Sequence, residues 1–203
     1  MSAVAGSPLP YWRLSGFYFA YFALLGGVAP FLSLYFESLG FEPARIGELV
    51  AIPMLMRCIA PNLWGWLGDA TGQRLLIVRV GALLTALTFA GIFWRLDYWW
   101  LAAIMALHSF FWHAVLPQFE AITLAHLGSQ CSRYSQLRLW GSVGFILTVV
   151  LLGMLLQREG MGVYPMAMLG IMLLISLCSA LVPAPPQQPA AAQEHADGFL
   201  RRL

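Results

Sequence analysis

The feature that most constrains the fold of this chain is a series of long stretches with one charged side chain or none. The first, Leu14–Phe36, holds no charged residue at all. Five more stretches follow, each near the length of one bilayer crossing: Leu49–Gly68, Leu75–Trp94, Tyr98 to about His126, Leu139–Gln157 and Gly160–Val182. A helix needs about 20 apolar residues to cross a hydrocarbon layer of ~30 Å. A chain of 203 residues therefore has room for six crossings with short loops, and not for twelve.

Continuous apolar runs of this length predict helices, because backbone polar groups in lipid must be satisfied within the segment, and barrel strands are shorter and alternate. Only 10% of the residues are charged, whereas soluble domains carry about 25%. The sequence thus predicts an all-α membrane protein with six transmembrane helices over residues 14–182. Residues 1–13 are expected to form a cytoplasmic N-terminus. Residues 183–203, rich in Pro, Gln and Ala, are expected to form a cytoplasmic linker stub.

The arginines predict the orientation, since the chain contains no lysine. Seven fall on one side of the predicted spans: Arg13, Arg74, Arg79, Arg133, Arg138, Arg201 and Arg202. Three fall on the other side: Arg45, Arg95 and Arg158. Cytoplasmic loops carry the excess of positive charge, so both termini are expected in the cytoplasm, with the protein in a bacterial inner membrane. The first span exceeds the apolar region of a typical cleaved signal peptide.

Several functions are excluded by the residues available. The net charge is +2 and no basic run occurs outside the last three residues, which argues against a nucleic-acid partner. Without lysine the chain has no P-loop. His108 and His113 point in different directions on a helix, about 140° apart, which does not suit metal chelation. No metal or cofactor is expected.

One enzyme alternative is an intramembrane serine protease, because Gly141-Ser-Val-Gly144 lies in a predicted span. Such a serine normally takes the third place of Gly-x-Ser-Gly and needs a histidine base on a neighbouring helix. Here Ser142 takes the second place, and the sixth span contains no histidine. Small residues that let two helices pack closely are the favoured explanation. No enzymatic activity is expected.

The loop after the second span carries a recognisable pattern. Gly65, Asp69, Gly72 and Arg74 give the spacing Gly-x3-Asp-x2-Gly-x-Arg. This pattern, on the predicted cytoplasmic side, resembles the signature loop between the second and third helices of the major facilitator superfamily. Physically, the glycines permit a six-residue turn, and Asp69 can pair with Arg74 at the membrane surface. The resemblance implies the N-terminal half of that fold, with six helices in two three-helix inverted repeats, and an aspartate that also contacts the second half.

A second pattern narrows the resemblance. Glu120 lies in the fourth span, and Arg138 follows eighteen residues later within the stretch Tyr134–Phe145. This stretch resembles the fifth-helix opening of the phenylpropionate-permease and nucleoside-symporter-like branch, related to lactose permease. In lactose permease an acid and an arginine at this spacing bind the substrate, and an aromatic residue seven positions beyond the arginine stacks on the sugar. The resemblance implies that Glu120, Arg138 and Phe145 bind substrate. Lactose permease has Trp where this chain has Phe145, which argues against a sugar.

Physical reasoning supports the same pair. An ionisable residue inside a span is costly, so it should face a cavity and find a partner. At 1.5 Å per residue, Arg57 lies about 18 Å above the cytoplasmic end of its helix, whereas Glu120 lies only about 10 Å above its own. Arg138 begins a helix on that side and is the better partner, while Arg57 is expected to line the cavity higher up. A static salt bridge between Glu120 and Arg138 is the structural alternative.

Three further residues are candidates for the same cavity. If this bundle handles protons, Glu120 or His113 must carry them, because arginine does not release its proton in proteins. His113 as a hydrogen-bonded packing residue is the favoured alternative. Tyr18 and Tyr21 of the first span are candidate lining residues, although aromatics on membrane helices more often serve packing.

The sequence therefore predicts half of a secondary transporter. The expected function is proton-coupled uptake of a small organic solute such as an aromatic acid or a nucleoside. The expected partners are the small-molecule substrate, protons, the lipid bilayer and a second six-helix half, supplied by a separate chain or by a second copy. The alternative is a non-transporting truncated product or membrane subunit, in which the polar residues only hold the bundle together.

Overall fold

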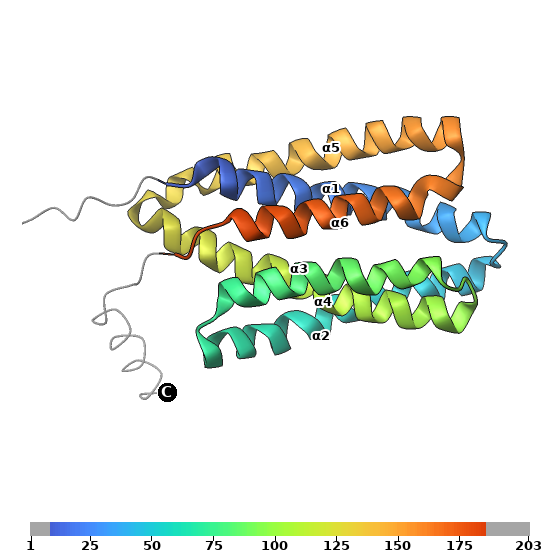
Figure 1. Cartoon of the computed structure of the whole chain (residues 1–203), viewed down its shortest axis with the longest axis horizontal. Coiled ribbons are helices and arrows are strands. Elements are labelled where there is room, and N and C mark those ends of the chain that lie inside the picture. Colours follow the sequence, from blue (N-terminus) through green and yellow to red (C-terminus); the bar gives the residue numbers. More distant parts are fainter. Residues whose placement is uncertain (1–8, 186–203) are drawn as a thin grey trace, which may run out of the picture.

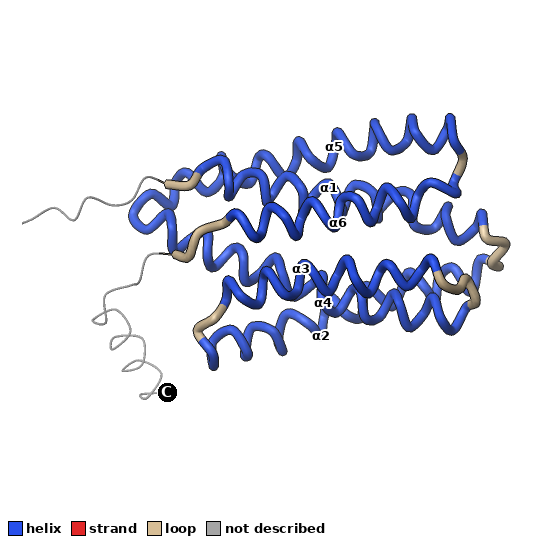
Figure 2. The backbone as a smooth tube through the Cα atoms, viewed as in Figure 1, coloured by secondary structure: helices blue, strands red, loops and turns tan. Residues whose placement is uncertain are grey.

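The computed structural model describes residues 9–185, and helices account for nearly all of them (Figures 1 and 2). The described residues contain six α-helices joined by short connections. Their bounds are α1 Tyr11–Ser38, α2 Pro43–Thr71, α3 Arg74–Phe89, α4 Tyr98–Leu127, α5 Tyr134–Glu159 and α6 Tyr164–Leu181. Five helical segments are long and apolar enough to cross a membrane, and one of these, Tyr98–Glu159, contains both α4 and α5. Residues 1–8 and 186–203, including most of the predicted linker, lie outside the described residues.

The helix ends follow local residue chemistry rather than the limits of the apolar runs. α2 begins with a proline at its first position and ends at Gly72, whose φ of 65° is left-handed. The carboxylate of Asp97 caps α4 by accepting a hydrogen bond from the Trp100 amide at 3.1 Å. α6 begins later than the apolar run, because Gly160 turns the chain at φ 80° and a short 3₁₀ helix precedes Tyr164.

The helices gather in two groups that mix the early and the late parts of the chain (Figure 1). α1 packs against α5 and α6, whereas α4 packs against α2 and α3. Contacts between α3 and α6 join the two groups. Helices distant in the sequence therefore form the main interfaces, so the fold depends on long-range packing.

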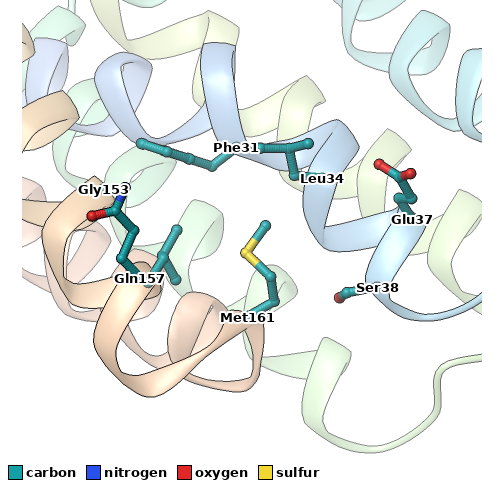
Figure 3. A pocket seen from close by; sticks show the side chains of 8 residues that line it. Phe31, Leu34, Glu37, Ser38, Gly153, Gln157 and Met161 are labelled. Carbon is teal, nitrogen blue, oxygen red and sulfur yellow. The ribbon is translucent and has the colours of Figure 1, made fainter.

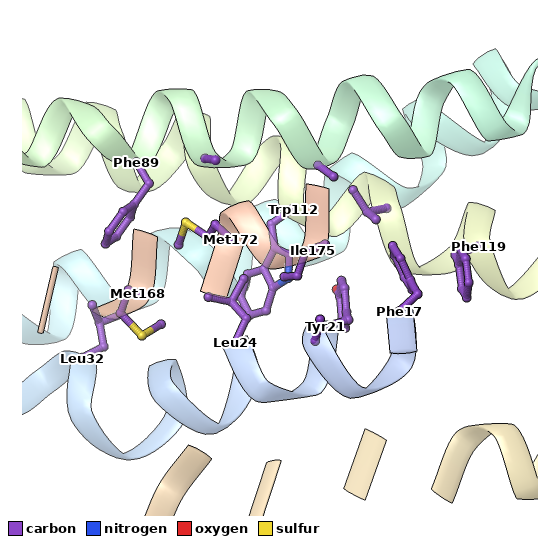
Figure 4. Packing of buried hydrophobic residues seen from close by; sticks show 14 of the residues in the cluster. Phe17, Tyr21, Leu24, Leu32, Phe89, Trp112, Phe119, Met168, Met172 and Ile175 are labelled. Carbon is purple, nitrogen blue, oxygen red and sulfur yellow. The ribbon is translucent and has the colours of Figure 1, made fainter. Parts of the chain in front are cut away.

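Aromatic stacking and close backbone contact hold α1 against its neighbours. Phe17 of α1 stacks on Phe119 of α4, with ring centroids 3.6 Å apart (Figure 4). On the α5 side, a Cβ atom added to Gly26 would lie 2.6 Å from the Phe145 carbonyl oxygen, and one added to Gly144 would lie 2.9 Å from the Phe19 carbonyl carbon. The glycine pair of the Gly141-Ser-Val-Gly144 stretch thus serves close helix packing, as the sequence predicted.

Candidate substrate-binding site

The two intramembrane charges of α4 and α5 lie side by side. Glu120 Oε1 is 3.9 Å from Nε of Arg138, and each side chain is 35% exposed. This distance falls within an ion pair but is longer than a hydrogen bond. The pairing expected from the depth of the two residues is therefore present, and both charges reach the surface of the bundle.

Aromatic side chains position both charges. The hydroxyl of Tyr134 donates a hydrogen bond to Glu120 Oε1 at 3.1 Å. The Arg138 guanidinium lies over the ring of Phe22, 3.9 Å from its centroid, and 5.8 Å from the centroid of Tyr18. Cation–π contact of this kind orients a planar guanidinium without using its N–H donors.

A recess opens beside the arginine. It has a volume of about 440 Å³ and is lined by Phe22, Arg138, Ser142, Phe145 and Ile146. Phe145 and Arg138 are seven residues apart, which places them on one face of α5 two turns apart. The recess therefore joins a fixed positive charge to a largely apolar wall, the arrangement expected of a small-molecule site.

The two tyrosines of α1 lie deeper than expected for lining residues. Tyr18 is fully buried, and its hydroxyl donates to Thr123 Oγ1 of α4 at 3.2 Å. Tyr21 is 5% exposed and packs against Trp112, with ring centroids 5.7 Å apart (Figure 4). Both rings pack within the bundle, and Tyr18 also lies near the Arg138 guanidinium.

The other two charged or titratable candidates lie apart from the recess. Arg57 is exposed on α2, within electrostatic range of Tyr21 and His113. The Nδ1 atom of His113 is 2.8 Å from the Ser109 carbonyl oxygen, one turn earlier in α4. That bond fits the packing alternative for His113. Within residues 9–185, the ion-pair partner of Glu120 is Arg138 and not Arg57, as expected.

The signature loop is shorter than the six-residue turn expected from its glycines. α2 continues through Thr71 and α3 begins at Arg74, so the chain reverses over Gly72 and Gln73 alone. The left-handed φ of 65° at Gly72 makes this possible. The side chains of Asp69 and Arg74 form the expected ion pair. Gly65 lies inside α2, and a Cβ there would meet nothing within 4 Å, so its role within the described bundle is not steric.

Gln118 of α4 anchors this loop and was not predicted. Its Oε1 accepts a hydrogen bond from Arg74 at 3.0 Å, and its Nε2 donates to the Trp64 carbonyl at 2.9 Å. The side chain is 1% exposed and lies against Gly68, where an added Cβ would come 2.6 Å from Oε1. The sequence holds one indication of this role: Gln118 is a side-chain amide within an apolar stretch, two residues before Glu120.

Two residues around Arg138 were also missed. Tyr134 stands four residues before Arg138, a spacing that puts both on one face of α5. Phe22 stands four residues after Tyr18 on α1, so it shares the face of a residue that was selected. The spacing was therefore visible in the sequence, whereas the contact between α1 and α5 was not.

A second, larger recess lies at the other end of α1 and α5. Its volume is about 500 Å³, and Figure 3 shows its lining. The residues that line it come from both helices and the turn after α5: Phe31, Leu34, Glu37, Ser38, Gly153, Leu156, Gln157 and Met161. Its wall is mainly apolar, and none of the predicted site residues line it.

Comparison with known proteins identifies the family. The family model described as the MFS_1 like family matches residues 11–198. The chain belongs to this family of major facilitator superfamily transporters. Among solved structures, the nucleoside transporter NupG superposes with a TM-score of 0.78, at 18% sequence identity, over 93% of this chain and 46% of that one. The helical bundle thus has the major facilitator fold, and the resemblance read from the signature loop is confirmed.

Two curated relatives are similar in sequence to this chain. Maltose permease of Geobacillus stearothermophilus is 32% identical over 145 residues, covering 68% of this chain and 36% of its own length. The probable 3-phenylpropionic acid transporter of Escherichia coli is 31% identical over 139 residues, with the same two coverages of 68% and 36%. The chain thus aligns with little more than a third of the length of each of these relatives.

Proposed function

We propose that this chain is the N-terminal bundle of a secondary active transporter that takes up a small organic solute together with protons. The observation that carries this proposal is the Glu120–Arg138 pair, in which each side chain is 35% exposed beside an aromatic recess. A purely structural ion pair gains little from staying accessible at a site where charge is costly. A binding site needs both access and a few placed polar groups in an apolar wall.

The lining of the recess favours an aromatic acid or a nucleoside as the substrate class. Phe22, Phe145 and Ile146 supply flat or apolar surface, while Arg138 and Ser142 supply the polar groups. A sugar has many hydroxyl groups, and each needs a partner when it is removed from water. We use three solutes as probes. Two relatives are named for maltose and 3-phenylpropionic acid, and the fold is similar to that of a nucleoside transporter.

Glu120 is the favoured proton carrier. It lies at the bundle surface between a tyrosine donor and an arginine. His113 is the second candidate, but its Nδ1 atom is already bonded to the backbone of its own helix. Arginine keeps its proton throughout the physiological pH range. Arg138 therefore binds the substrate or pairs with Glu120, and it does not transfer protons.

The proposed topology has six crossings in two inverted three-helix repeats, over residues 14–182. The helix contacts support this topology. If α1, α2 and α3 are matched with α4, α5 and α6, the main contacts of the first three helices correspond to those of the last three. The α1–α5 contact corresponds to α4–α2, and α1–α6 corresponds to α4–α3. With the arginine excess placed inside, the N-terminus and the segment 183–203 are cytoplasmic in a bacterial inner membrane.

We further propose that transport requires a second six-helix half, from a separate chain or a second copy. α2 buries only Leu49, Ala60 and Gly68 within the described bundle, which leaves most of that helix for lipid or a partner. The alternative function is a non-transporting subunit or truncated product.

Uptake into proteoliposomes tests the proposal. The purified chain is reconstituted with an inward proton gradient, and uptake of radiolabelled 3-phenylpropionate, uridine and maltose is measured. Glu120→Gln and Arg138→Ala are each expected to abolish uptake of the transported probe. Glu48→Gln and Arg95→Ala are matched controls, because both residues lie at the opposite end of the bundle. If wild-type protein moves none of the probes, alone or with a companion half, the non-transporting alternative is correct.

A further inference from the structure

Glu120 has two neighbours at one carboxylate oxygen. Tyr134 Oη is 3.1 Å from Oε1, and Arg138 Nε is 3.9 Å from the same atom. Only the tyrosine lies at hydrogen-bond distance. A carboxylate facing an unbonded arginine would normally close that gap, because charge-assisted pairs are stronger and shorter than this. Within residues 9–185 the Tyr134 hydroxyl makes the hydrogen bond to Glu120, whereas Arg138 stays beyond hydrogen-bond distance.

The arginine is held on its other side by an aromatic ring. The guanidinium lies 3.9 Å from the centre of Phe22 and lines the recess. Within residues 9–185 its N–H groups donate no hydrogen bond, although the group carries five donors. The side chain is 35% exposed and lines the recess, so part of it is accessible. Phe22 thus orients Arg138, and within residues 9–185 no side chain takes up its N–H donors in a hydrogen bond.

Tyr134 itself is well fixed. It lies four residues before Arg138, so both side chains leave the same face of α5 toward α4. The ring of Tyr18 packs edge-on against it, with centroids 6.3 Å apart. Tyr18 is in turn bonded to Thr123 of α4. This chain of contacts gives the Tyr134 hydroxyl one fixed direction, toward Glu120.

We infer that Tyr134 is a positioning residue of the candidate site: its hydroxyl holds the Glu120 carboxylate off Arg138 and leaves the guanidinium free for a ligand. This inference rests on the proposed function, since it concerns the same site. Tyr134 acts through Glu120. Without its hydroxyl, the Glu120–Arg138 ion pair closes to hydrogen-bond distance, and a substrate must then break that bond.

Chemical labelling of Arg138 tests this without any substrate. The arginine reagent phenylglyoxal is applied to the purified full chain, and modification at Arg138 is followed by peptide mass spectrometry. Tyr134→Phe keeps the ring and removes the hydroxyl, and is expected to slow labelling of Arg138 roughly tenfold, the effect of one charge-assisted hydrogen bond. Adding Glu120→Gln to that variant removes the competing charge and is expected to restore the wild-type rate.

A matched control exists at the opposite end of α4. Tyr98 donates to Glu48 at 2.5 Å, so Tyr98→Phe removes another tyrosine–glutamate bond and is expected to leave Arg138 labelling unchanged. An unchanged rate in Tyr134→Phe overturns the inference. So does slow labelling that persists when Glu120→Gln is added, because the loss would then reflect general damage to the fold.

Transport kinetics give a second, separate readout. With whichever of 3-phenylpropionate, uridine or maltose the wild type transports, Tyr134→Phe is expected to raise KM roughly tenfold with a smaller change in kcat. A fall in kcat at constant KM contradicts the positioning role. The labelling result is read without transport, so a wild type that moves no probe refutes the proposed function, while the labelling experiment still decides the role of Tyr134.

Discussion

The crossing of α1 and α5 leaves no space at Gly144, which makes Gly144→Ala a strong test of the packing. A Cβ at this position would lie 2.9 Å from the carbonyl carbon of Phe19 and 3.1 Å from its Cα. Both atoms belong to the backbone of α1, so no change of rotamer relieves the contact. The added methyl group must push the two helices apart.

The size of the effect follows from these distances. Carbon atoms in contact lie about 3.5–4.0 Å apart, and the Phe19 carbonyl oxygen lies nearer still to the added Cβ, so the helices must separate locally by roughly 1 Å or more. Overpacking of this kind costs about 1–3 kcal/mol. For a chain of this size each kcal/mol lowers Tm by about 2–4 °C, and we expect a fall of roughly 2–12 °C. Phe145 follows Gly144 directly, so the displacement also reaches the candidate recess.

Thermal unfolding in detergent measures this, with the fluorescence of the 8 tryptophans as the signal. Gly170→Ala in α6 is the matched control, because a Cβ there meets nothing within 4 Å. Alanine is the better helix former by about 1 kcal/mol, so the control is expected to keep or raise Tm. A wild-type Tm for Gly144→Ala would refute the close-packing argument, as would an equal loss in Gly170→Ala.

Three further outcomes are expected from single substitutions. Gln118→Leu removes the buried partner of Arg74 and should cost about 1–3 kcal/mol, seen as faster amide exchange in the loop between α2 and α3. Arg79→Ala removes two hydrogen bonds to the last turn of α6 and a third, of 2.9 Å, to the Val182 carbonyl just after it. Amide exchange should therefore rise at that helix end and not in α1. Asp97→Ala removes the cap on the Trp100 amide and should lower the stability by about 1 kcal/mol, measured as Tm against wild type.

The positions of the helices were predictable because lipid imposes a length. Each predicted stretch coincides with one of the six α-helices, and the errors lie at the ends. α5 begins at Tyr134, five residues before the apolar run at Leu139, because polar residues continue a helix wherever the backbone bonds allow it. Hydropathy predicts the part of a helix that lies in lipid, whereas the residues at which the helix begins and ends depend on caps such as Gly72 and Asp97.

The candidate site was predictable where a single residue carried a large energetic cost. Glu120 and Arg138 stand out because charge inside a span is expensive, and counting residues from the helix ends was enough to pair them. Tyr134, Phe22 and Gln118 carry no such cost, since tyrosine, phenylalanine and glutamine are tolerated in many settings. Their roles depend on which helices touch, and only the folded bundle supplies that information.

The same helix carries both the loop anchor and the candidate acid, and this restricts how the bundle can move. Gln118 and Glu120 are two residues apart, which separates them by about 200° around α4. One side of the helix therefore bonds Arg74 and α2, while the other faces Tyr134 and Arg138 of α5. Because a helix is rigid over so short a distance, α4 cannot turn or tilt at the signature loop without moving the Glu120 carboxylate relative to α5. The 3.9 Å gap between Glu120 and Arg138 is thus a sensitive measure of the position of α4 against α5.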